Sequence, residues 1–151
     1  MKKLCIIASV AALAIAGTAD AEPIGRWWAG FGQGNFEYAI KNDSAGSDEF
    51  YIGCGELPTT IRFRIGGVEP IEGQSVLINI GADEFDLRLG RQGRFETKSH
   101  VESDNFHALW DVIRSGKIMR VRLSTGQSTV FTLKGAAKAL PKEACSTDFE
   151  R

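Results

Sequence analysis

The chain has 151 residues, of which 25% are charged and 43% are hydrophobic, and its formal net charge is −1 at pH 7. This near-neutral balance argues against bulk binding to nucleic acid or to an anionic membrane surface, because both need a surplus of cationic side chains. The length is sufficient for one domain with a hydrophobic core of its own.

The N-terminal residues have the pattern of a secretory signal. Two lysines precede the apolar run 4–16, and the small residues of 19–21 form a signal-peptidase site. The run is too short to span a bilayer, and no later segment reaches the roughly 18 apolar residues of a membrane helix. A lipoprotein would need a cysteine after the run, whereas Cys5 lies at its start. We therefore expect cleavage near Ala21, before Glu22, and export to the periplasm or the exterior.

The expected mature chain, residues 22–151, contains two cysteines, Cys54 and Cys145. In an oxidising compartment the default expectation is one disulfide between them. The alternative is a redox or metal-binding pair. That alternative is disfavoured because the sequence has neither Cys-x-x-Cys spacing nor a histidine cluster near the cysteines.

The stretch 25–36 reads GRWWAGFGQGNF. Its glycines lack the spacing of a phosphate-binding loop, so that interpretation is set aside. Trp27 and Trp28 are adjacent, and on a strand they point to opposite faces, so at most one of them can belong to the core. The other is a candidate for contact with a ligand or a partner. The alternative, which we favour, is a glycine-loosened edge strand that bends at 30–34.

From Phe36 onward, alternation of apolar and polar residues predicts a series of short strands separated by polar or glycine-rich turns. The expected strands are 36–41, 49–54, 60–65, 75–80, 85–89, a short one around 95–98, 117–123 and 128–133.

Two helices interrupt this series. An apolar stripe with helical spacing begins at Phe106, and we expect Ser103 or Asp104 to cap this helix and 115–116 to end it. A second short helix is expected at 135–140. Eight or nine short strands with two short helices predict a mainly β, single-domain antiparallel β-sandwich or barrel-like fold.

The common motifs of hydrolases and nucleotide-binding proteins are missing from the sequence. His107 and Asp111 have helical i, i+4 spacing and could orient an imidazole for general-base chemistry, but a solvated surface pair is the favoured interpretation. The acidic residues of 83–86 are likewise interpreted as solvated rather than as a glycosidase pair. We therefore expect a non-enzymatic protein without a cofactor or a metal.

Arginines occupy the outward positions of several expected strands. If two of these strands were neighbours, the guanidinium groups would form a patch suited to phosphate or carboxylate. The alternative, which we favour, is that they pair across the sheet with acids such as Glu37 and Asp86. The arginines of this candidate surface are Arg62, Arg64, Arg88, Arg120 and Arg122.

The order of these features resembles a group of small secreted proteobacterial proteins, the invasion-associated locus B and VasI-like kind. The likeness lies in the strand that ends at Cys54, the segments IRFRI, SVLINI, FHALWDVIRSG and IMRVRLSTGQSTVFTLKGAAKAL, and the closing Cys145. It covers roughly residues 50–145 and carries no catalytic motif.

This resemblance implies a periplasmic β-sandwich with an accessory role at the envelope, in secretion systems or host contact. The expected function is thus a non-enzymatic accessory, virulence or inhibitor protein that binds another envelope or secreted protein. The alternative is a binding module for an anionic envelope glycan or lipid, such as lipopolysaccharide or peptidoglycan fragments.

Overall fold

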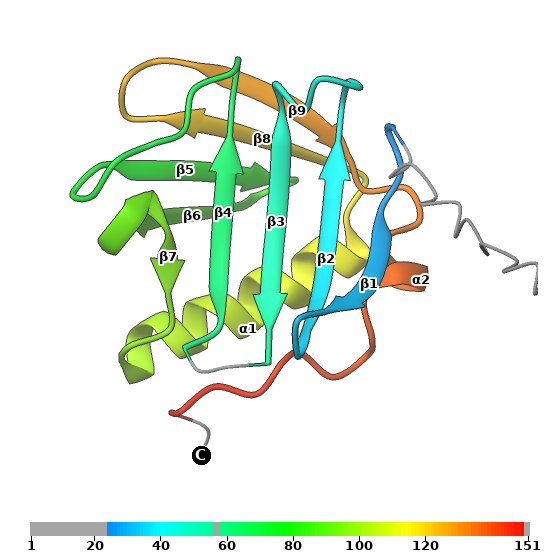
Figure 1. The fold of residues 1–151 in the computed structure, drawn as a ribbon, viewed down its shortest axis with the longest axis vertical. Helices are drawn as coiled ribbons and strands as arrows, with labels where there is room; N and C mark the ends of the chain where they lie inside the picture. The colour runs from blue at the N-terminus through cyan, green and yellow to red at the C-terminus, as the bar shows by residue number, and fades with distance from the viewer. Residues whose placement is uncertain (1–23, 56–57, 150–151) are drawn as a thin grey trace, which may run out of the picture.

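A computed structural model describes residues 24–55 and 58–149, and the expected signal sequence, 1–21, lies outside the described residues. The described chain forms nine strands and two α-helices (Figure 1), so the predicted alternation of short strands and turns is confirmed. The strands are β1 (Trp28–Gly32), β2 (Asn35–Lys41), β3 (Glu49–Cys54), β4 (Thr60–Arg64), β5 (Ser75–Ile80), β6 (Asp83–Arg88), β7 (Phe95–Glu96), β8 (Ile118–Leu123) and β9 (Ser128–Thr132). The helices are α1 (His100–Ser115) and α2 (Ala136–Ala139).

The strands form two antiparallel sheets, with the orders β1-β2-β3-β4-β7 and β6-β5-β8-β9. In Figure 1 the strands of the second sheet run across the back of the upper half of the first, and α1 crosses behind its lower half. The first sheet therefore has one inner face, covered by the second sheet and α1, and one outer face. The predicted mainly β, sandwich-like fold is confirmed.

The core is built from the inward positions of the strands, because alternate side chains of a strand point to opposite faces. Phe50 of β3 contacts Trp27 and Phe131 of β9, with ring centroids 5.8 and 6.5 Å apart, and so joins the two sheets. Trp110 of α1 packs edge-on against Tyr38 of β2, with centroids 5.2 Å apart. These two aromatic groups hold the second sheet and α1 against the same inner face.

Helix α1 begins four or five residues earlier than the expected cap at Ser103 or Asp104 implies, so that expected cap is wrong. Ser99 caps the helix instead, and its hydroxyl accepts a hydrogen bond from the backbone N–H of Glu102 at 3.2 Å. The Ser103 hydroxyl is buried and bonds that of Thr147 at 2.5 Å. The first turn of α1 thus packs through polar contacts with the C-terminal tail, and these leave no apolar stripe in the sequence.

A disulfide joins Cys54, at the end of β3, to Cys145 in the C-terminal tail, as predicted; their Cα atoms are 5.8 Å apart. The indole N–H of Trp110 also donates to the backbone oxygen of Pro141 at 3.1 Å, so the tail is anchored to α1 as well as to β3. Among the described residues, no helix has the length and apolarity that spanning a membrane requires.

Candidate functional site

The five arginines of the candidate surface are divided between the two sheets. Arg62 and Arg64 lie on β4 of the first sheet, Arg88 lies on β6 of the second, and Arg120 and Arg122 lie on β8. Strand β5 separates β6 from β8, so none of the three strands is a neighbour of another. The five side chains therefore do not form one patch.

The outer face of the second sheet mixes both signs of charge. Arg122 and Asp86 flank the same residue of β5 from its two sides, and Arg120 and Glu84 flank Asn79 in the same way. The Asn79 amide donates to the Glu84 carboxylate at 2.8 Å. Such interspersed charges are typical of a solvated sheet face.

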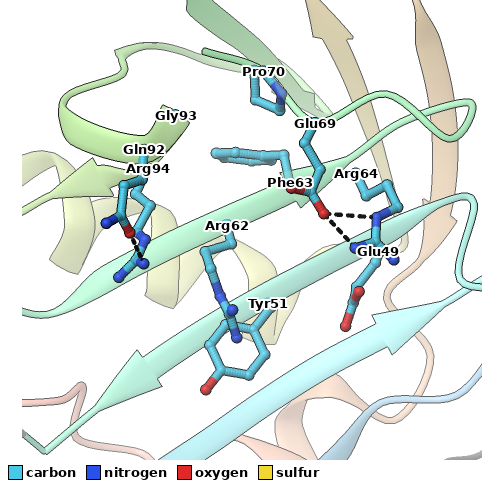
Figure 2. Close-up of a pocket in the computed structure, with 10 residues that line it drawn as sticks. All are labelled: Glu49, Tyr51, Arg62, Phe63, Arg64, Glu69, Pro70, Gln92, Gly93 and Arg94. Carbon is cyan, nitrogen blue, oxygen red and sulfur yellow. Dashed lines mark hydrogen bonds and ion pairs between the residues drawn. The ribbon is translucent and has the colours of Figure 1, made fainter. Parts of the chain in front are cut away.

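Arg62 and Arg64 line a pocket of about 210 Å³ beside β4, on the outer face of the first sheet (Figure 2). Strand β7 pairs with β4 at Thr60 and Ile61, and the described residues place no further strand along β4 beyond them. We call the part of β4 beyond Ile61, residues 62–64, the open β4 edge. We call the cavity the arginine pocket, and its lining is Glu49, Tyr51, Arg62, Phe63, Arg64, Glu69, Pro70, Gln92, Gly93 and Arg94.

Arg62 stands at the centre of the arginine pocket. Its guanidinium lies over the ring of Tyr51, 3.9 Å from the ring centroid, and the Tyr51 hydroxyl donates to Glu37 at 2.8 Å (Figure 2 shows the stacked pair). Stacking on an aromatic face positions an arginine and leaves the N–H groups at its edge available to bind a carboxylate. Arg62 is exposed, so these donors are accessible to a partner.

The other two arginines flank Arg62. The Nε of Arg64 donates to Glu69 at 3.0 Å, and this hydrogen bond raises the pKa of the Arg64 guanidinium above its usual value. Arg94 donates to the side-chain oxygen of Gln92. Among the described lining residues, three are arginines and two are glutamates, so the pocket has a net positive charge.

A close backbone contact holds Arg94 beside β4. Gly93 has φ +65°, and a Cβ at this position would lie 1.7 Å from the backbone oxygen of Pro70. A glycine is needed here because other residues could neither adopt this φ easily nor approach so closely. The turn 91–93 therefore packs directly on the loop that carries Glu69, and the two segments together form one wall of the pocket.

The two tryptophans have different environments, and of the two Trp27 alone belongs to the hydrophobic core, in agreement with the prediction that at most one of them can. Trp27 is 7% exposed, and its indole N–H donates to the backbone oxygen of Thr132 at 3.0 Å. Trp28 is half-buried and lies over Gly30, where a Cβ would come 2.8 Å from an indole carbon. Its strand, β1, is the edge strand that the glycine-rich stretch predicted.

A second cavity, of about 570 Å³, opens beside Trp28 between β1 and the segment that leads from β9 into α2. Its lining includes the side chains of Arg26, Lys134 and Lys138. We call it the Trp28 pocket. It lies at β1, at one side of the first sheet, whereas the arginine pocket lies at β4, near the other side.

His107 and Asp111, the candidate catalytic pair, lie one turn apart on α1. Among the contacts of the described residues, no hydrogen bond or ion pair joins them. The ring of His100 packs against that of Phe149, with centroids 5.2 Å apart. Within 24–55 and 58–149, no group of three or more His, Cys, Asp or Glu side chains is placed to hold a metal ion.

Sequence reasoning missed several residues of both pockets. Tyr51 alternates with Phe50 and Ile52, so its outward direction was readable, but its position under Arg62 follows from the register of β3 with β4. Residues that lie in turns gave no such signal. The residues missed are Tyr51, Glu69 and Arg94 of the arginine pocket, and Arg26, Lys134 and Lys138 of the Trp28 pocket.

Comparison with known proteins gives a family but no characterised relative. A family model described as YfjT matches residues 25–140, a range that includes both pockets and ends before Cys145. No curated protein and no solved structure matches the chain. The resemblance to invasion-associated locus B and VasI-like proteins stays a prediction. Because the model covers well over half of its length, the chain belongs to the YfjT family.

Proposed function

We propose that the protein is a non-enzymatic accessory protein of the bacterial periplasm that binds an acidic segment of another envelope or secreted protein in the arginine pocket. The observation that carries this proposal is the position of three arginines beside the open β4 edge. An unpaired edge can accept an extended segment by strand addition, in which main-chain hydrogen bonds supply affinity and side-chain contacts supply specificity.

The size of the pocket favours a protein segment over a small molecule. Small-molecule sites typically enclose roughly 300–1,000 Å³, whereas the arginine pocket encloses about 210 Å³. A segment lying along the open β4 edge needs no deep cavity, because only individual side chains enter it. Its carboxylates would bind the edges of Arg62 and Arg94, with the two-pronged geometry that arginine offers to carboxylates.

The periplasmic location rests on two features. The signal pattern at 1–21 directs export, and the Cys54–Cys145 disulfide is a bond that persists in oxidising compartments. Periplasmic export would place the arginine pocket among envelope and secreted proteins. A role in secretion, virulence or inhibition is what the resemblance to invasion-associated locus B and VasI-like proteins adds.

The alternative is an anionic envelope ligand bound on the five arginines, together with the paired tryptophans. It is less well supported in that form, since Arg88, Arg120 and Arg122 belong to the mixed-charge outer face of the other sheet. The remaining pair, Arg62 and Arg64, lies in a pocket of about 210 Å³, which is smaller than the roughly 300–1,000 Å³ of sites that enclose a compact ligand.

The test is quantitative affinity capture from the periplasm of the native bacterium, with bound proteins measured by mass spectrometry. Three baits are compared: the unchanged protein, Arg62→Glu/Arg94→Glu, and the charge-matched control Arg120→Glu/Arg122→Glu. We expect one protein in stoichiometric amount with the first and third baits and its loss with the second. Equal recovery with both double variants, or no stoichiometric protein on any bait, would refute the proposal.

A further inference from the structure

The Trp28 pocket has the size of a small-ligand site. Its volume of about 570 Å³ lies within the roughly 300–1,000 Å³ range of such sites. It is lined by β1 on one side and by the β9–α2 segment on the other. The indole N–H of Trp27 ties these two walls together through its hydrogen bond to Thr132.

The charge of this pocket has one sign. Among its described lining residues, Arg26, Lys134 and Lys138 are cationic and none is acidic. All three are exposed, and no ion pair joins any of them to another described residue. Three unpaired cations around one cavity favour an anionic ligand. The arginine pocket differs in this respect, because two glutamates there offset the charge of the arginines.

Trp28 adds an apolar aromatic surface to these cations. Its indole N–H is buried and has no hydrogen-bond partner among the described residues. A buried donor without a partner is unfavourable, and a ligand that offers an acceptor to this N–H would satisfy it. Tryptophan combines an apolar body with one polar group, which suits a ligand with both an apolar ring face and polar substituents.

We infer that the Trp28 pocket binds an anionic saccharide, a sugar ring that bears a phosphate or a carboxylate. The ring packs against Trp28, and the acidic group lies among Arg26, Lys134 and Lys138. This function is independent of partner binding at β4, since the two pockets occupy different sides of the first sheet and share no lining residue.

Isothermal titration calorimetry tests this with four probes: glucose 1-phosphate, glucuronate, glucose and inorganic phosphate. We expect one or both sugar anions to bind, and glucose and phosphate to bind at least about tenfold more weakly, because each lacks half of the recognition. Comparison of the two sugar anions shows whether phosphate or carboxylate is preferred. The inference is refuted if neither sugar anion binds, or if inorganic phosphate binds as tightly as glucose 1-phosphate.

Variants locate the binding. Lys134→Glu/Lys138→Glu should weaken the affinity for the sugar anion at least about tenfold. The charge-matched Arg120→Glu/Arg122→Glu should leave that affinity unchanged, as should Arg62→Glu/Arg94→Glu. Retention of that affinity in the arginine-pocket variant separates this inference from the proposed function. Equal weakening in all three double variants would mean a nonspecific charge effect and would overturn it.

Nuclear magnetic resonance gives a readout that needs no variant of the pocket lysines. The chain has three tryptophans, and the indole N–H resonance of Trp28 can be assigned as the one that Trp28→Phe removes. On addition of the sugar anion it should shift more than that of Trp110, which is bonded to Pro141 and does not line the pocket. An unmoved Trp28 resonance at saturating sugar anion would refute the assignment of the site.

Discussion

The disulfide between Cys54 and Cys145 should contribute a large share of the stability of the fold. The perturbation is Cys54→Ala/Cys145→Ala, which removes the bond and leaves no free thiol in the described chain. The two cysteines are 91 residues apart in sequence. For a loop of that length, the chain-entropy relation gives a loss of about 4–5 kcal/mol in the free energy of unfolding.

The variant should nevertheless remain folded. A typical domain has a free energy of unfolding of about 5–15 kcal/mol, and the tail keeps other anchors, including the Trp110–Pro141 hydrogen bond at 3.1 Å. A second remaining anchor is the hydroxyl of Thr59, which donates to the backbone oxygen of Ser146 at 3.0 Å. For a domain of this size, the expected loss corresponds to a decrease in melting temperature on the order of 15 °C.

Thermal unfolding followed by circular dichroism measures this difference. We compare the oxidised protein, the same protein after reduction, and the double variant. Thiol titration under denaturing conditions reports whether the disulfide exists. We expect the reduced protein and the double variant to melt at similar, lower temperatures. The reasoning is refuted if all three melt within about 3 °C of one another, or if the purified mature protein contains two titratable thiols.

Three further changes test particular contacts. Burial, together with the hydrogen bond to Glu37, raises the pKa of the Tyr51 phenol, and the charge of Arg62 opposes this effect. Arg62→Ala should therefore raise the pKa of Tyr51 further, which an alkaline absorbance titration measures. An unchanged or lower pKa would mean that the two side chains are not in contact. Ser99→Ala removes the cap of α1 and should cost about 0.5–2 kcal/mol in urea unfolding, whereas an unaltered midpoint would contradict the capping assignment. Gly93→Ala should lower the melting temperature more than a surface glycine change, because the new methyl group would meet Pro70, and a neutral effect would disprove that contact.

The fold was predictable because the apolar residues show the alternation of strands and the wider spacing of a helix clearly in the sequence. Alternation in segments such as 49–54 and 118–123 assigned each side chain to a face, and the buried positions agree with it. The start of α1 was missed for a physical reason. Ser103 packs through a hydroxyl–hydroxyl contact with Thr147, 44 residues away in the sequence, and a polar contact of that kind leaves no hydrophobic periodicity.

The sites were less predictable than the fold, because sheet order brings their residues together. The sequence correctly placed the side chains of Arg62 and Arg120 on outward faces of their strands, yet the two strands belong to different sheets. Arg94 lines the same pocket as Arg62 because the turn before it packs on Pro70, and that approach depends on one glycine. The Trp28 pocket joins β1 to the β9–α2 segment, more than 100 residues later, and short-range pattern cannot reveal such a contact.

Site-specific photo-crosslinking in living cells tests most directly whether the arginine pocket is the partner site. A photoreactive amino acid replaces Gln92, which lies exposed in the wall of the pocket, and a matched protein carries it at the exposed Arg120 of the other sheet. We predict a single crosslinked periplasmic protein from position 92, joined through an acidic segment, and none from position 120. The same adduct from both positions, or none from position 92, would contradict the account.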